Sequence, residues 1–263
     1  MKYALITGAA GGMGSCAAAK LQQQGYTVFA LDKVPGENTD TLIWLETDVT
    51  DEESVSKAFA QVAGRTDRLD AVIHFAGMYM LDSLVEMDTA AYDRIFAVNV
   101  RGAFLINRIF MPLLGSDSRI LMVTSELAPL DPLPFTGIYA VTKSALDKYA
   151  YALAMELQLL GIRVSVLRAG AVKTGMLGVS TKALDSFCRN TRLYTCNAAR
   201  FKAIVERVEA RNIPPEKLAD KACKILEKRN PRYAYRINAN PLLLLLNALP
   251  KGFQLWIIRK ILR

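Results

Sequence analysis

The feature that most restricts how this chain can fold is a glycine-rich turn between a strand-like segment and a helix-like segment. Residues 2–7 (KYALIT) are apolar enough for a buried strand, residues 8–14 read GAAGGMG, and residues 15–21 (SCAAAKL) favour a helix. Glycines permit a tight turn and a close approach of backbone to phosphate, and a helix N-terminus adds unpaired N–H groups. This order of elements predicts a dinucleotide-binding unit whose pyrophosphate lies on residues 8–14. The alternative is a turn that binds no ligand.

An acidic residue follows the second predicted strand. Gly25 ends the first helix, residues 26–31 are apolar, and Asp32 closes that segment. A carboxylate about 20 residues after the glycines can accept hydrogen bonds from both ribose hydroxyls and repels a 2′-phosphate. Asp32 therefore favours NAD over NADP, although the neighbouring Lys33 could offset part of this repulsion. The other role open to Asp32 is to stabilise a turn.

Strand-like and helix-like segments alternate along the rest of the chain. Further strands are expected at residues 42–45, 69–77, 118–125, 161–167 and 232–237. Helices are expected between them, the longest over 88–114 and 138–160. This alternation is typical of α/β folds with a parallel sheet. We therefore predict a single Rossmann-like, doubly wound domain over residues 1–240, with about seven parallel strands and helices on both faces.

The composition agrees with such a domain and argues against several other classes. With 263 residues, 52% of them hydrophobic, the chain can bury a substantial core. One histidine and four cysteines without a CxxC pair predict no zinc or other metal site. Because a strand-like segment starts right after Met1, we expect no cleavable signal, reduced thiols and a cytoplasmic location. We expect the ring of His74 at a strand edge near the cofactor rather than in catalysis.

A second motif stands near the start of the long 138–160 segment. Tyr139 and Lys143 are four residues apart, so on a helix their side chains share one face. An ammonium group beside a phenol stabilises the phenolate, which predicts a lowered pKa for Tyr139. Such a phenol can exchange a proton with an alcohol near neutral pH, which is general acid–base catalysis. Taken alone, the pair also fits an ordinary surface helix.

Two polar residues stand in apolar surroundings. Ser125 ends the strand expected over 118–125, at the carboxyl edge where ligands bind open α/β sheets. Asn99 lies within the segment FAVNV (96–100). A side-chain amide is costly there unless it is hydrogen-bonded, so we expect Asn99 to have a partner.

Together these motifs resemble those of the short-chain dehydrogenase/reductase family, over about residues 1–230. They occur in the family's order as Thr7-Gly8-x-x-x-Gly12-x-Gly14, Asp48, Asn99, Ser125 and Tyr139-x-x-x-Lys143. The resemblance implies that Tyr139 is the catalytic acid/base and that Lys143 lowers its pKa and binds the nicotinamide ribose. It also implies that Ser125 holds the substrate oxygen and that Asn99 supports a proton relay through water.

The resemblance also implies a set of cofactor contacts. They are Gly8, Gly11, Gly12, Met13, Gly14, Asp32, Asp48, Val49, Ala76, Gly77, Tyr139, Lys143, Val172 and Thr174. Asp48 and Val49 are expected at the adenine, and Val172 and Thr174 near the nicotinamide carboxamide. Members that prefer NADP often carry a basic residue where this chain has Gly11, so this position also favours NAD.

Two segments depart from the family pattern. Residues 74–77 read HFAG where the family often has NNAG, so the turn is kept while its usual polar contacts are not expected. Ala169-Gly170 stands where Pro-Gly is common, which is a mild change.

Residues 175–212 are expected to form a lid over the substrate, because binding segments occur where a scaffold tolerates variation. They combine apolar side chains with basic ones, namely Met176, Leu177, Val179, Leu184, Phe187, Leu193, Tyr194 and Phe201 with Arg189, Arg192 and Arg200. The apolar residues imply a lipophilic or extended substrate. The arginines could meet an acidic group, but we expect them on a solvated face.

The C-terminal tail, residues 241–263, is apolar and basic. Residues 201–263 hold fourteen Lys/Arg and five Asp/Glu, which is +9 of a total net charge of +8. Polar residues and a proline between 247 and 252 interrupt the apolar run, so the tail is too short to span a membrane. Phe253, Trp256, Ile257 and Ile261 recur at helical spacing among basic residues. This pattern predicts either a helix lying on an anionic bilayer or a tail packed on protein.

These features predict an NAD(H)-dependent oxidoreductase that interconverts a lipophilic secondary alcohol and its ketone, of steroid, retinoid or lipid type. One alternative is an NADPH-dependent 3-oxoacyl thioester reductase, and another is a nucleotide-sensing or scaffold protein without turnover. The expected partners are the small substrate and further copies of the chain, as a homodimer or homotetramer through the helices at 88–114 and 138–160. We expect no nucleic acid partner, because the positive charge is confined to the end of the chain. A peripheral membrane contact through residues 241–263 stays open.

Overall fold

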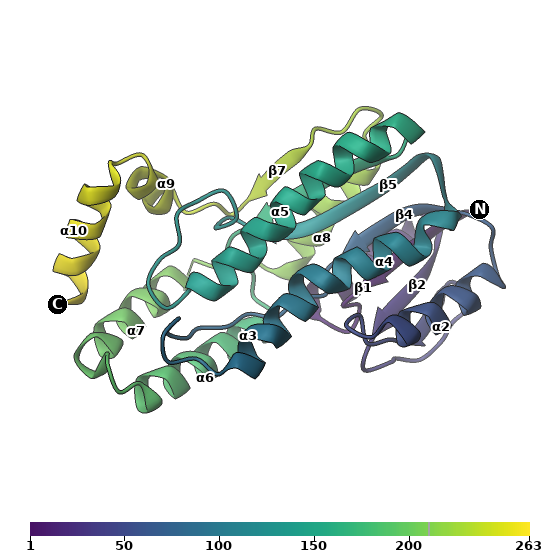
Figure 1. Ribbon diagram of the computed structural model, residues 1–263. Helices are drawn as coiled ribbons and strands as arrows, with labels where there is room; N and C mark the ends of the chain where they lie inside the picture. Colours follow the sequence, from purple (N-terminus) through teal and green to yellow (C-terminus); the bar gives the residue numbers. More distant parts are fainter. Residues whose placement is uncertain (210) are drawn as a thin grey trace.

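The computed structural model describes residues 1–209 and 211–263, apart from the side chains of 175–182, 208 and 209. Within these residues a seven-stranded parallel sheet has the order β3-β2-β1-β4-β5-β6-β7 (Figure 1). The strands are β1 (Lys2–Thr7), β2 (Tyr26–Asp32), β3 (Leu42–Glu46), β4 (Leu69–His74), β5 (Leu114–Ser125), β6 (Arg163–Ala169) and β7 (Ala234–Ile237). The predicted Rossmann-like fold with parallel strands is thus confirmed.

Helices cover both faces of the sheet, as the apolar strands require. The covering helices are α1 (Gly12–Gln23), α2 (Glu52–Ala63), α4 (Gly102–Phe110), α5 (Gly137–Leu157) and α8 (Pro215–Leu226). Leu5 points into the core shared with α2, α4 and α5, whereas its neighbours Ala4 and Ile6 point into the core shared with α1 and α8. Successive residues of a strand face opposite sides, so a strand buried on both faces must be apolar throughout.

The segment expected as one helix over 88–114 consists of several parts. They are α3 (Thr89–Phe96), a π-helical turn η1 (Ala97–Arg101), α4 and a 3₁₀ turn η2 (Met111–Leu113). Strand β5 begins at Leu114 rather than at 118, because Leu114 pairs with Leu69 before the register shifts. Residues 89–113 are long and apolar enough to cross a membrane by length and composition. Ile95, Ile106 and Phe110 are nevertheless fully buried, which indicates core helices.

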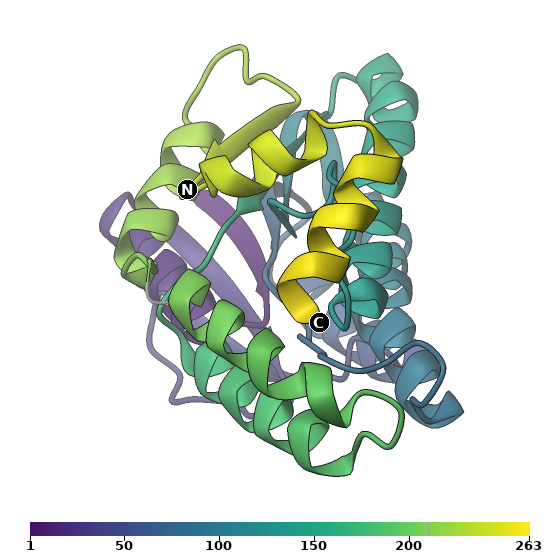
Figure 2. The ribbon, with the colours of Figure 1, turned by 90° about the vertical axis from the view of Figure 1, so that its left-hand side faces the viewer.

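The lid leaves the sheet after β6 and returns before α8. It contains α6 (Gly175–Asn190) and α7 (Thr195–Glu209), the two green helices that run side by side in Figure 2. Its two ends are joined at the base, where Lys173 N–H donates to Ile213 O (2.8 Å) and Ile213 N–H donates to Ala171 O (3.1 Å). The Asn238 amide also donates to the carbonyls of Ala171 and Arg211, each at 2.8 Å. These hydrogen bonds therefore hold the two ends of the lid together next to the sheet.

The tail forms two short helices, α9 (Pro241–Asn247) and α10 (Lys251–Leu262), drawn in yellow in Figures 1 and 2. One face of α10 packs on the same subunit. Gln254 and Leu262 are buried, and Leu262 packs into the lid cluster that contains Phe187 and Phe201. The Asn197 amide donates to Leu262 O at 2.7 Å. The tail thus contacts protein on one side, and its other side is exposed.

Candidate active site

The glycine turn after β1 has close backbone contacts that only glycine permits. Gly8 has φ +69°, and a Cβ there would lie 2.6 Å from Ala76 N. A Cβ on Gly14 would lie 2.2 Å from Gly8 O. The turn leads into α1, whose N-cap is Gly11. Gly12 faces Thr174, whose side chain would lie 3.4 Å from a Cβ placed on Gly12. A helix N-terminus reached by such a bare backbone fits a pyrophosphate.

A cavity of about 650 Å³ opens above this turn, at the carboxyl ends of the strands. Most of the expected cofactor residues line it, namely Gly8, Gly11, Gly12, Met13, Gly14, Asp32, Val49, Ala76, Gly77 and Thr174. Its size lies within the roughly 300–1,000 Å³ of typical ligand pockets. The residues present therefore fit a dinucleotide, which would lie with its pyrophosphate at residues 8–14.

Asp32 and Asp48 are both engaged by neighbours. The Asp32 carboxylate accepts hydrogen bonds from Ala10 N–H (2.9 Å) and Val34 N–H (3.3 Å), so it also stabilises the turn. Lys33 forms an ion pair with Asp48 at 2.7 Å. Burial raises the pKa of Asp48, but the hydrogen bonds from Lys33 and Thr50 outweigh this and lower the pKa overall. Asp48 does not line the cavity itself but holds Lys33, which does.

Asn99 has the hydrogen-bond partners expected from its apolar surroundings. It sits in the π-helical turn, where its Oδ1 accepts from Met78 N–H (2.8 Å) and its Nδ2 donates to Met78 O and Thr142 Oγ1, each at 3.0 Å. The turn thereby joins the loop after β4 to helix α5. A Cβ placed on Gly77 would lie 3.4 Å from Asn99 Oδ1 and 3.2 Å from Lys143 Nζ, so these three residues meet. The proton-relay role of Asn99 stays a prediction.

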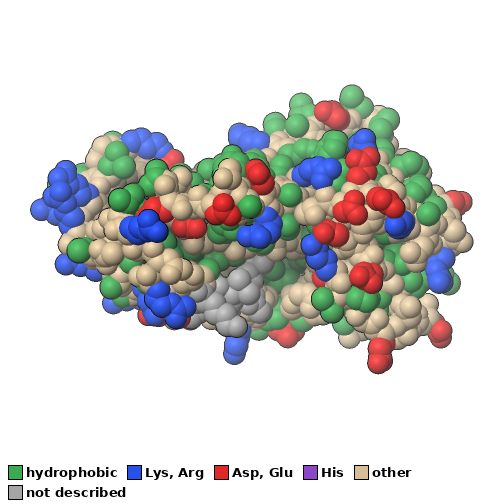
Figure 3. Space-filling model, turned by 60° about the horizontal axis from the view of Figure 1, so that its bottom comes forward, with side chains coloured by type: hydrophobic (Ala, Val, Ile, Leu, Met, Phe, Trp, Pro, Cys, Tyr) green, Lys and Arg blue, Asp and Glu red, His purple; other side chains and the backbone are tan. Residues whose placement is uncertain are grey.

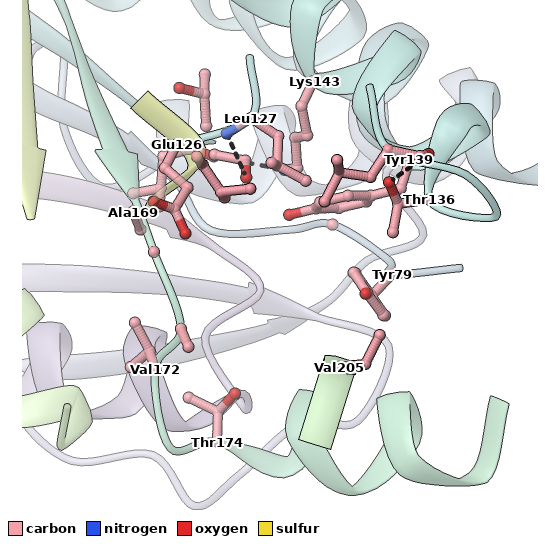
Figure 4. Close-up of a pocket in the computed structure, with 18 of the residues that line it drawn as sticks. Tyr79, Glu126, Leu127, Thr136, Tyr139, Lys143, Ala169, Val172, Thr174 and Val205 are labelled. Carbon is pink, nitrogen blue, oxygen red and sulfur yellow. Dashed lines mark hydrogen bonds between the residues drawn. The ribbon is translucent and has the colours of Figure 1, made fainter. Parts of the chain in front are cut away.

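Ser125, Tyr139, Lys143 and Val172 line a second cavity of about 200 Å³. It adjoins the first, because Met13, Phe75, Gly77, Tyr79 and Thr174 line both. The end of β5 supplies Ser125, and the first turns of α5 supply Tyr139 and Lys143, which are labelled in Figure 4. Three of the four expected catalytic residues therefore line this cavity, whereas Asn99 does not. The cavity walls are mostly apolar side chains.

The predicted pKa of Tyr139 is wrong for the protein alone. Burial raises it to about 12, and a hydrogen bond with Ser125 opposes this rise only in part. Lys143 Nζ lies 5.8 Å from the centroid of the Tyr139 ring rather than beside its hydroxyl. Burial without an acidic partner lowers the pKa of Lys143 to about 8. Desolvation therefore outweighs the attraction expected from the i, i+4 spacing, and it acts on both groups.

Helix α5 is fixed to the sheet one turn beyond Lys143. The Asp147 carboxylate binds Arg168 of β6 through two hydrogen bonds, from Nε at 3.0 Å and from Nη2 at 2.7 Å. Both side chains are largely buried. The Tyr233 hydroxyl donates to Asp147 O at 2.7 Å. This bidentate pair, which the sequence patterns did not reveal, positions the face of α5 that carries Tyr139.

His74 lies away from both cavities, so its expected place near the cofactor is wrong. Its side chain is buried beneath α4, where Nε2 lies 2.9 Å from Asn107 Oδ1. The Asn107 amide in turn donates to the Tyr149 hydroxyl at 3.2 Å. Burial lowers the pKa of His74 to about 4, although the bond with Asn107 opposes this shift. The period-2 alternation of β4 turns His74 toward the same core as Val72.

The lid and tail close the second cavity. Phe201, Ile204 and Val205 of α7 line it, together with Leu243 of α9. Leu184 and Phe187 pack behind them, whereas Leu193 is exposed, and Met176, Leu177 and Val179 lie outside the described side chains. The exposed positions of Arg189, Arg192 and Arg200 confirm the expected solvated face. The lid therefore presents an apolar surface to the cavity.

The residues that line the cavity but were missed by the sequence patterns include Glu126 and Leu243. Glu126 directly follows Ser125, and its position next to a candidate catalytic residue was the available signal. Leu243 belongs to the leucine run of the tail, and no local pattern indicates that one leucine of the run turns back toward Ser125.

Comparisons with known proteins place this architecture in a family. The family model described as short chain dehydrogenase matches residues 2–185. A 3-ketodihydrosphingosine reductase of Bacteroides thetaiotaomicron is 28% identical over 250 residues, covering 95% of this chain and 91% of the relative. A versicolorin reductase of Emericella nidulans is 31% identical over 197 residues, covering 70% and 75%. Mouse estradiol 17-beta-dehydrogenase 2 is 33% identical over 191 residues, covering 67% and 50%.

Solved structures show the same fold. A short-chain dehydrogenase from Streptomyces avermitilis gives a TM-score of 0.77 at 20% identity, covering 97% of this chain and 96% of that one. A 3-ketoacyl-(acyl-carrier-protein) reductase from Brucella melitensis, complexed with NADH, gives 0.73 at 24% identity, covering 91% and 98%. The chain therefore belongs to the short chain dehydrogenase family and is an NAD(P)-dependent alcohol dehydrogenase or ketone reductase.

Proposed function

We propose that this protein is an NAD(H)-dependent oxidoreductase that interconverts a lipophilic secondary alcohol and its ketone. The observation that carries the proposal is the apolar cavity in which Ser125 and Tyr139 meet beside the larger dinucleotide cavity. A ketone oxygen placed between these two hydroxyls would lie next to the position of the nicotinamide. By their names, the relatives reported above are a 3-ketodihydrosphingosine reductase, a versicolorin reductase and an estradiol 17-beta-dehydrogenase, which supports an alcohol or ketone as the substrate.

Residues of this chain would supply the proton that the carbonyl oxygen takes up during ketone reduction. Ser125 would donate a hydrogen bond to the substrate oxygen, and Tyr139 would give that oxygen a proton during ketone reduction. When bound, the nicotinamide supplies the hydride and, in its oxidised form, a positive charge beside the phenol. Burial lowers the pKa of Lys143 to about 8, close to neutral pH, so this group is suited to pass a proton on.

The cofactor preference for NAD is supported by the two charges at the end of β2. Asp32 presents a carboxylate where the adenosine ribose would lie. Its neighbour Lys33 pairs with Asp48 rather than with Asp32, so it is held away from neutralising that carboxylate. Asp32→Asn keeps an acceptor for Ala10 N–H and removes the charge, so it should raise kcat/KM with NADPH relative to NADH by about 10- to 100-fold. An unchanged ratio would contradict this role.

Turnover assays test the function directly. Wild-type protein is incubated with NADH or NADPH and a panel of a long-chain ketone, a steroid ketone and an acetoacetyl thioester, and nucleotide oxidation is followed. We expect NADH oxidation with a lipophilic ketone and a fall of about 10²- to 10⁴-fold in Tyr139→Phe, the usual size of acid–base effects. Tyr139→Phe should still show a thermal shift with NADH.

Other outcomes would select the alternatives. NADPH oxidation with the thioester alone would favour an acyl thioester reductase. A thermal shift with nucleotide but no turnover of any alcohol or ketone would favour a nucleotide-sensing protein. Equal turnover in wild type and Tyr139→Phe would overturn the assigned acid/base.

We propose that the protein assembles as a homodimer or homotetramer through α4 and α5. Phe104 of α4 and Val141, Tyr151 and Met155 of α5 are exposed on these helices, at 44–53% of their full surface. Large apolar side chains gathered on neighbouring helices are typical of interfaces. Light scattering should give a mass of two or four chains, and Tyr151→Glu should lower it. A monomeric wild type would exclude this assembly.

We also propose that the exposed side of the tail docks on an anionic lipid bilayer. Phe253 and Trp256 are 48% and 53% exposed, and their rings stack at 5.4 Å. Lys260 lies one turn further along the same helical face. Figure 3 shows Lys and Arg side chains gathered beside hydrophobic ones at the end of the molecule that carries α10. Apolar and basic residues on one helical face are the features of an interfacial helix.

Charge favours a bilayer over a second copy of the chain on this face. Residues 241–263 contain four basic residues and no acidic one, so two copies would bring like charges together. The wild type should float with vesicles rich in phosphatidylserine and not with neutral vesicles. The double variant Phe253→Ser, Trp256→Ser should lose flotation, whereas Leu159→Ser, at an exposed leucine in the 3₁₀ turn η3 (Gln158–Leu160) that follows α5, should keep it. No flotation of the wild type would overturn the proposal, and its association into larger oligomers through the tail would do so too.

A further inference from the structure

The substrate cavity contains one feature that the proposed reaction does not use. Glu126 is the only acidic residue among the described residues that line it. It follows Ser125 directly, and its carboxylate lines the same cavity as the Tyr139 phenol (Figure 4). Its negative charge is one of the causes that raise the pKa of Tyr139. A carboxylate here therefore opposes the ionisation of the phenol, which is a cost to the reaction unless the carboxylate also serves the substrate.

The two oxygens of Glu126 have different surroundings. Oε2 accepts a hydrogen bond from Asn240 N–H at 2.6 Å, at the start of α9. Oε1 lies beside Gly170, 3.1 Å from where a Cβ would stand, and no described residue donates to it. Among the described residues no fully buried side-chain oxygen lacks a partner, so Oε1 is reached by solvent, and Gly170 beside it lines the cavity. One oxygen is thus occupied by the tail and the other is available to a ligand.

Anchoring the tail does not require a charge at this position. A neutral side-chain amide would accept the Asn240 N–H as well. Burial raises the pKa of Glu126, which shows that the site disfavours the ionised form in the protein alone. Removing a carboxylate from water without a cationic partner is unfavourable. A ligand that carries a positive charge would supply the missing partner.

We propose that Glu126 binds a primary ammonium group of the substrate, one or two carbon atoms from the reacting carbonyl. Ser125 and Glu126 line the same cavity of about 200 Å³, and the charge of Glu126 acts on the Tyr139 phenol, so groups bound by Ser125 and Glu126 lie close together in one molecule. The cavity of about 200 Å³ suits the polar end of an extended molecule, whose chain would leave along Phe201 and Leu243. The substrate class is then a long-chain amino ketone or the matching amino alcohol. This inference rests on the proposed ketone reductase function.

An ammonium group bound at Glu126 neutralises the charge that opposes ionisation of Tyr139. The correct substrate would therefore assist its own turnover, and kcat as well as KM should respond to the amino group. A hydroxyl group on the same carbon could donate a hydrogen bond to the Glu126 carboxylate, but it would not neutralise the negative charge.

Matched substrates test the proposal. Three long-chain ketones are compared that differ only at the carbon next to the carbonyl, which bears an amino group, a hydroxyl group or hydrogen. Wild type should prefer the amino ketone over the unsubstituted ketone by about 10- to 100-fold in kcat/KM, the size expected for a charge-assisted hydrogen bond. Glu126→Gln should remove most of that preference. The basic limb of the kcat profile for reduction, where Tyr139 loses its proton, should also lie at lower pH for the amino ketone than for the unsubstituted ketone.

A control variant separates substrate binding from tail anchoring. Asp131 also holds the tail, through Lys251 and Gln254, but does not line the cavity. Asp131→Asn should therefore leave the ratio between the two ketones within about twofold of wild type. No preference in wild type, or equal losses in Glu126→Gln and Asp131→Asn, would overturn the role of Glu126. A preference for the hydroxy ketone over the amino ketone would overturn the assignment of an ammonium group.

A binding measurement keeps this inference separate from the proposed function. Calorimetric titration compares a long-chain amino alcohol with the corresponding alcohol in the presence of NAD. Tighter binding of the amine in wild type, lost in Glu126→Gln, supports the role of Glu126 even if no ketone is reduced, and in that case the proposed function alone fails. Ketone reduction without any preference for amines would retain the proposed function and reject Glu126.

Discussion

The cofactor side and the substrate side of the sheet edge are built by different means. On the cofactor side, Gly8 and Gly14 are fixed by backbone contacts that leave no room for a Cβ, and Asn99 is held by three hydrogen bonds. On the substrate side, the walls come from α7 and α9, which the chain adds after the sheet is nearly complete. The difference lies in how each region is held, because the first is fixed by the sheet and its glycine turn and the second by helices outside the sheet.

The largest effect is expected on stability, when a contact that holds helix α5 rigidly on the sheet is removed. Asp147→Ala removes one partner of the buried pair with Arg168 and leaves a guanidinium without its carboxylate. We expect the free energy of unfolding to fall by about 3–5 kcal/mol, measured by urea denaturation. The double replacement Asp147→Leu, Arg168→Met should cost less than the single change. A loss below about 1 kcal/mol in Asp147→Ala would show that α5 is positioned by packing alone.

The next effect concerns the stability that the protein loses by burying the ammonium group of Lys143. The pKa of Lys143 falls from 10.5 to about 8 on folding. Below pH 8 both states carry the proton and the penalty is constant, and stability is regained as pH rises from 8 to 10.5, because the unfolded chain then binds more protons. Lys143→Met should therefore be more stable than wild type by about 3 kcal/mol at pH 7 and by less than about 1 kcal/mol at pH 10.

Thermal or urea unfolding at several pH values measures this difference. The measurement should stop near pH 10, because the raised pKa of Tyr139, about 12, makes the folded state lose stability as pH rises from 10 to 12. Lys143→Met should also lose activity. A constant difference between pH 7 and pH 10 would show that Lys143 is not desolvated.

A smaller effect lies in the core beneath the site. The pKa of His74 falls from 6.5 to about 4 on folding, so the unfolded chain binds the extra proton as pH falls from 6.5 to 4, and stability is lost over that range. At pH 5 the loss from this residue is about 2 kcal/mol. His74→Gln, which keeps a donor toward Asn107, should lose correspondingly less stability between pH 7 and pH 5. Equal acid sensitivity in both proteins would contradict a neutral buried imidazole.

The smallest effect is expected for the tail, residues 241–263, on the substrate side of the comparison. Asp131 pairs with the exposed Lys251, accepts from Gln254 Nε2 (3.2 Å), and through its N–H donates to Asn247 Oδ1 (2.6 Å). Asp131→Asn should change global stability by less than about 1 kcal/mol. It should nevertheless speed hydrogen exchange and protease cleavage within 241–263, because the tail has few other anchors. Unchanged exchange would show that the inner face of α10 suffices.

The nucleotide half could be predicted well from sequence because its determinants are local. A strand, a glycine turn and a helix are contiguous at residues 2–23, and the boundaries of β1 agree with the expected 2–7. The N-terminus of α2 is also a local feature, because Asp51 caps it by accepting from Glu53 N–H. The spacing of Tyr139 and Lys143 also fixes their common helical face without any knowledge of the tertiary structure.

The failures arise where distant segments meet. The pKa of Tyr139 depends on burial by segments far from its helix, so the i, i+4 rule alone gave the wrong sign. The buried position of His74 depends on its hydrogen bond with Asn107. The position of the Glu126 carboxylate depends on a hydrogen bond from Asn240, which is 114 residues away in the sequence. Whether the tail packs on protein could not be derived from an amphipathic pattern, because its inner face needs the lid as a partner.

The closed base of the lid has an evolutionary consequence. Because the backbone bonds between residues 171–173 and Ile213 tie its two ends together, the sheet meets the same pair of chain ends whatever lies between them. Lengthening such a loop costs little additional closure entropy, about 0.6 kcal/mol per doubling of its length. Evolution can therefore replace the lid without disturbing the sheet. A lid transplanted from a relative could change the substrate range while the residues of the sheet edge stay the same.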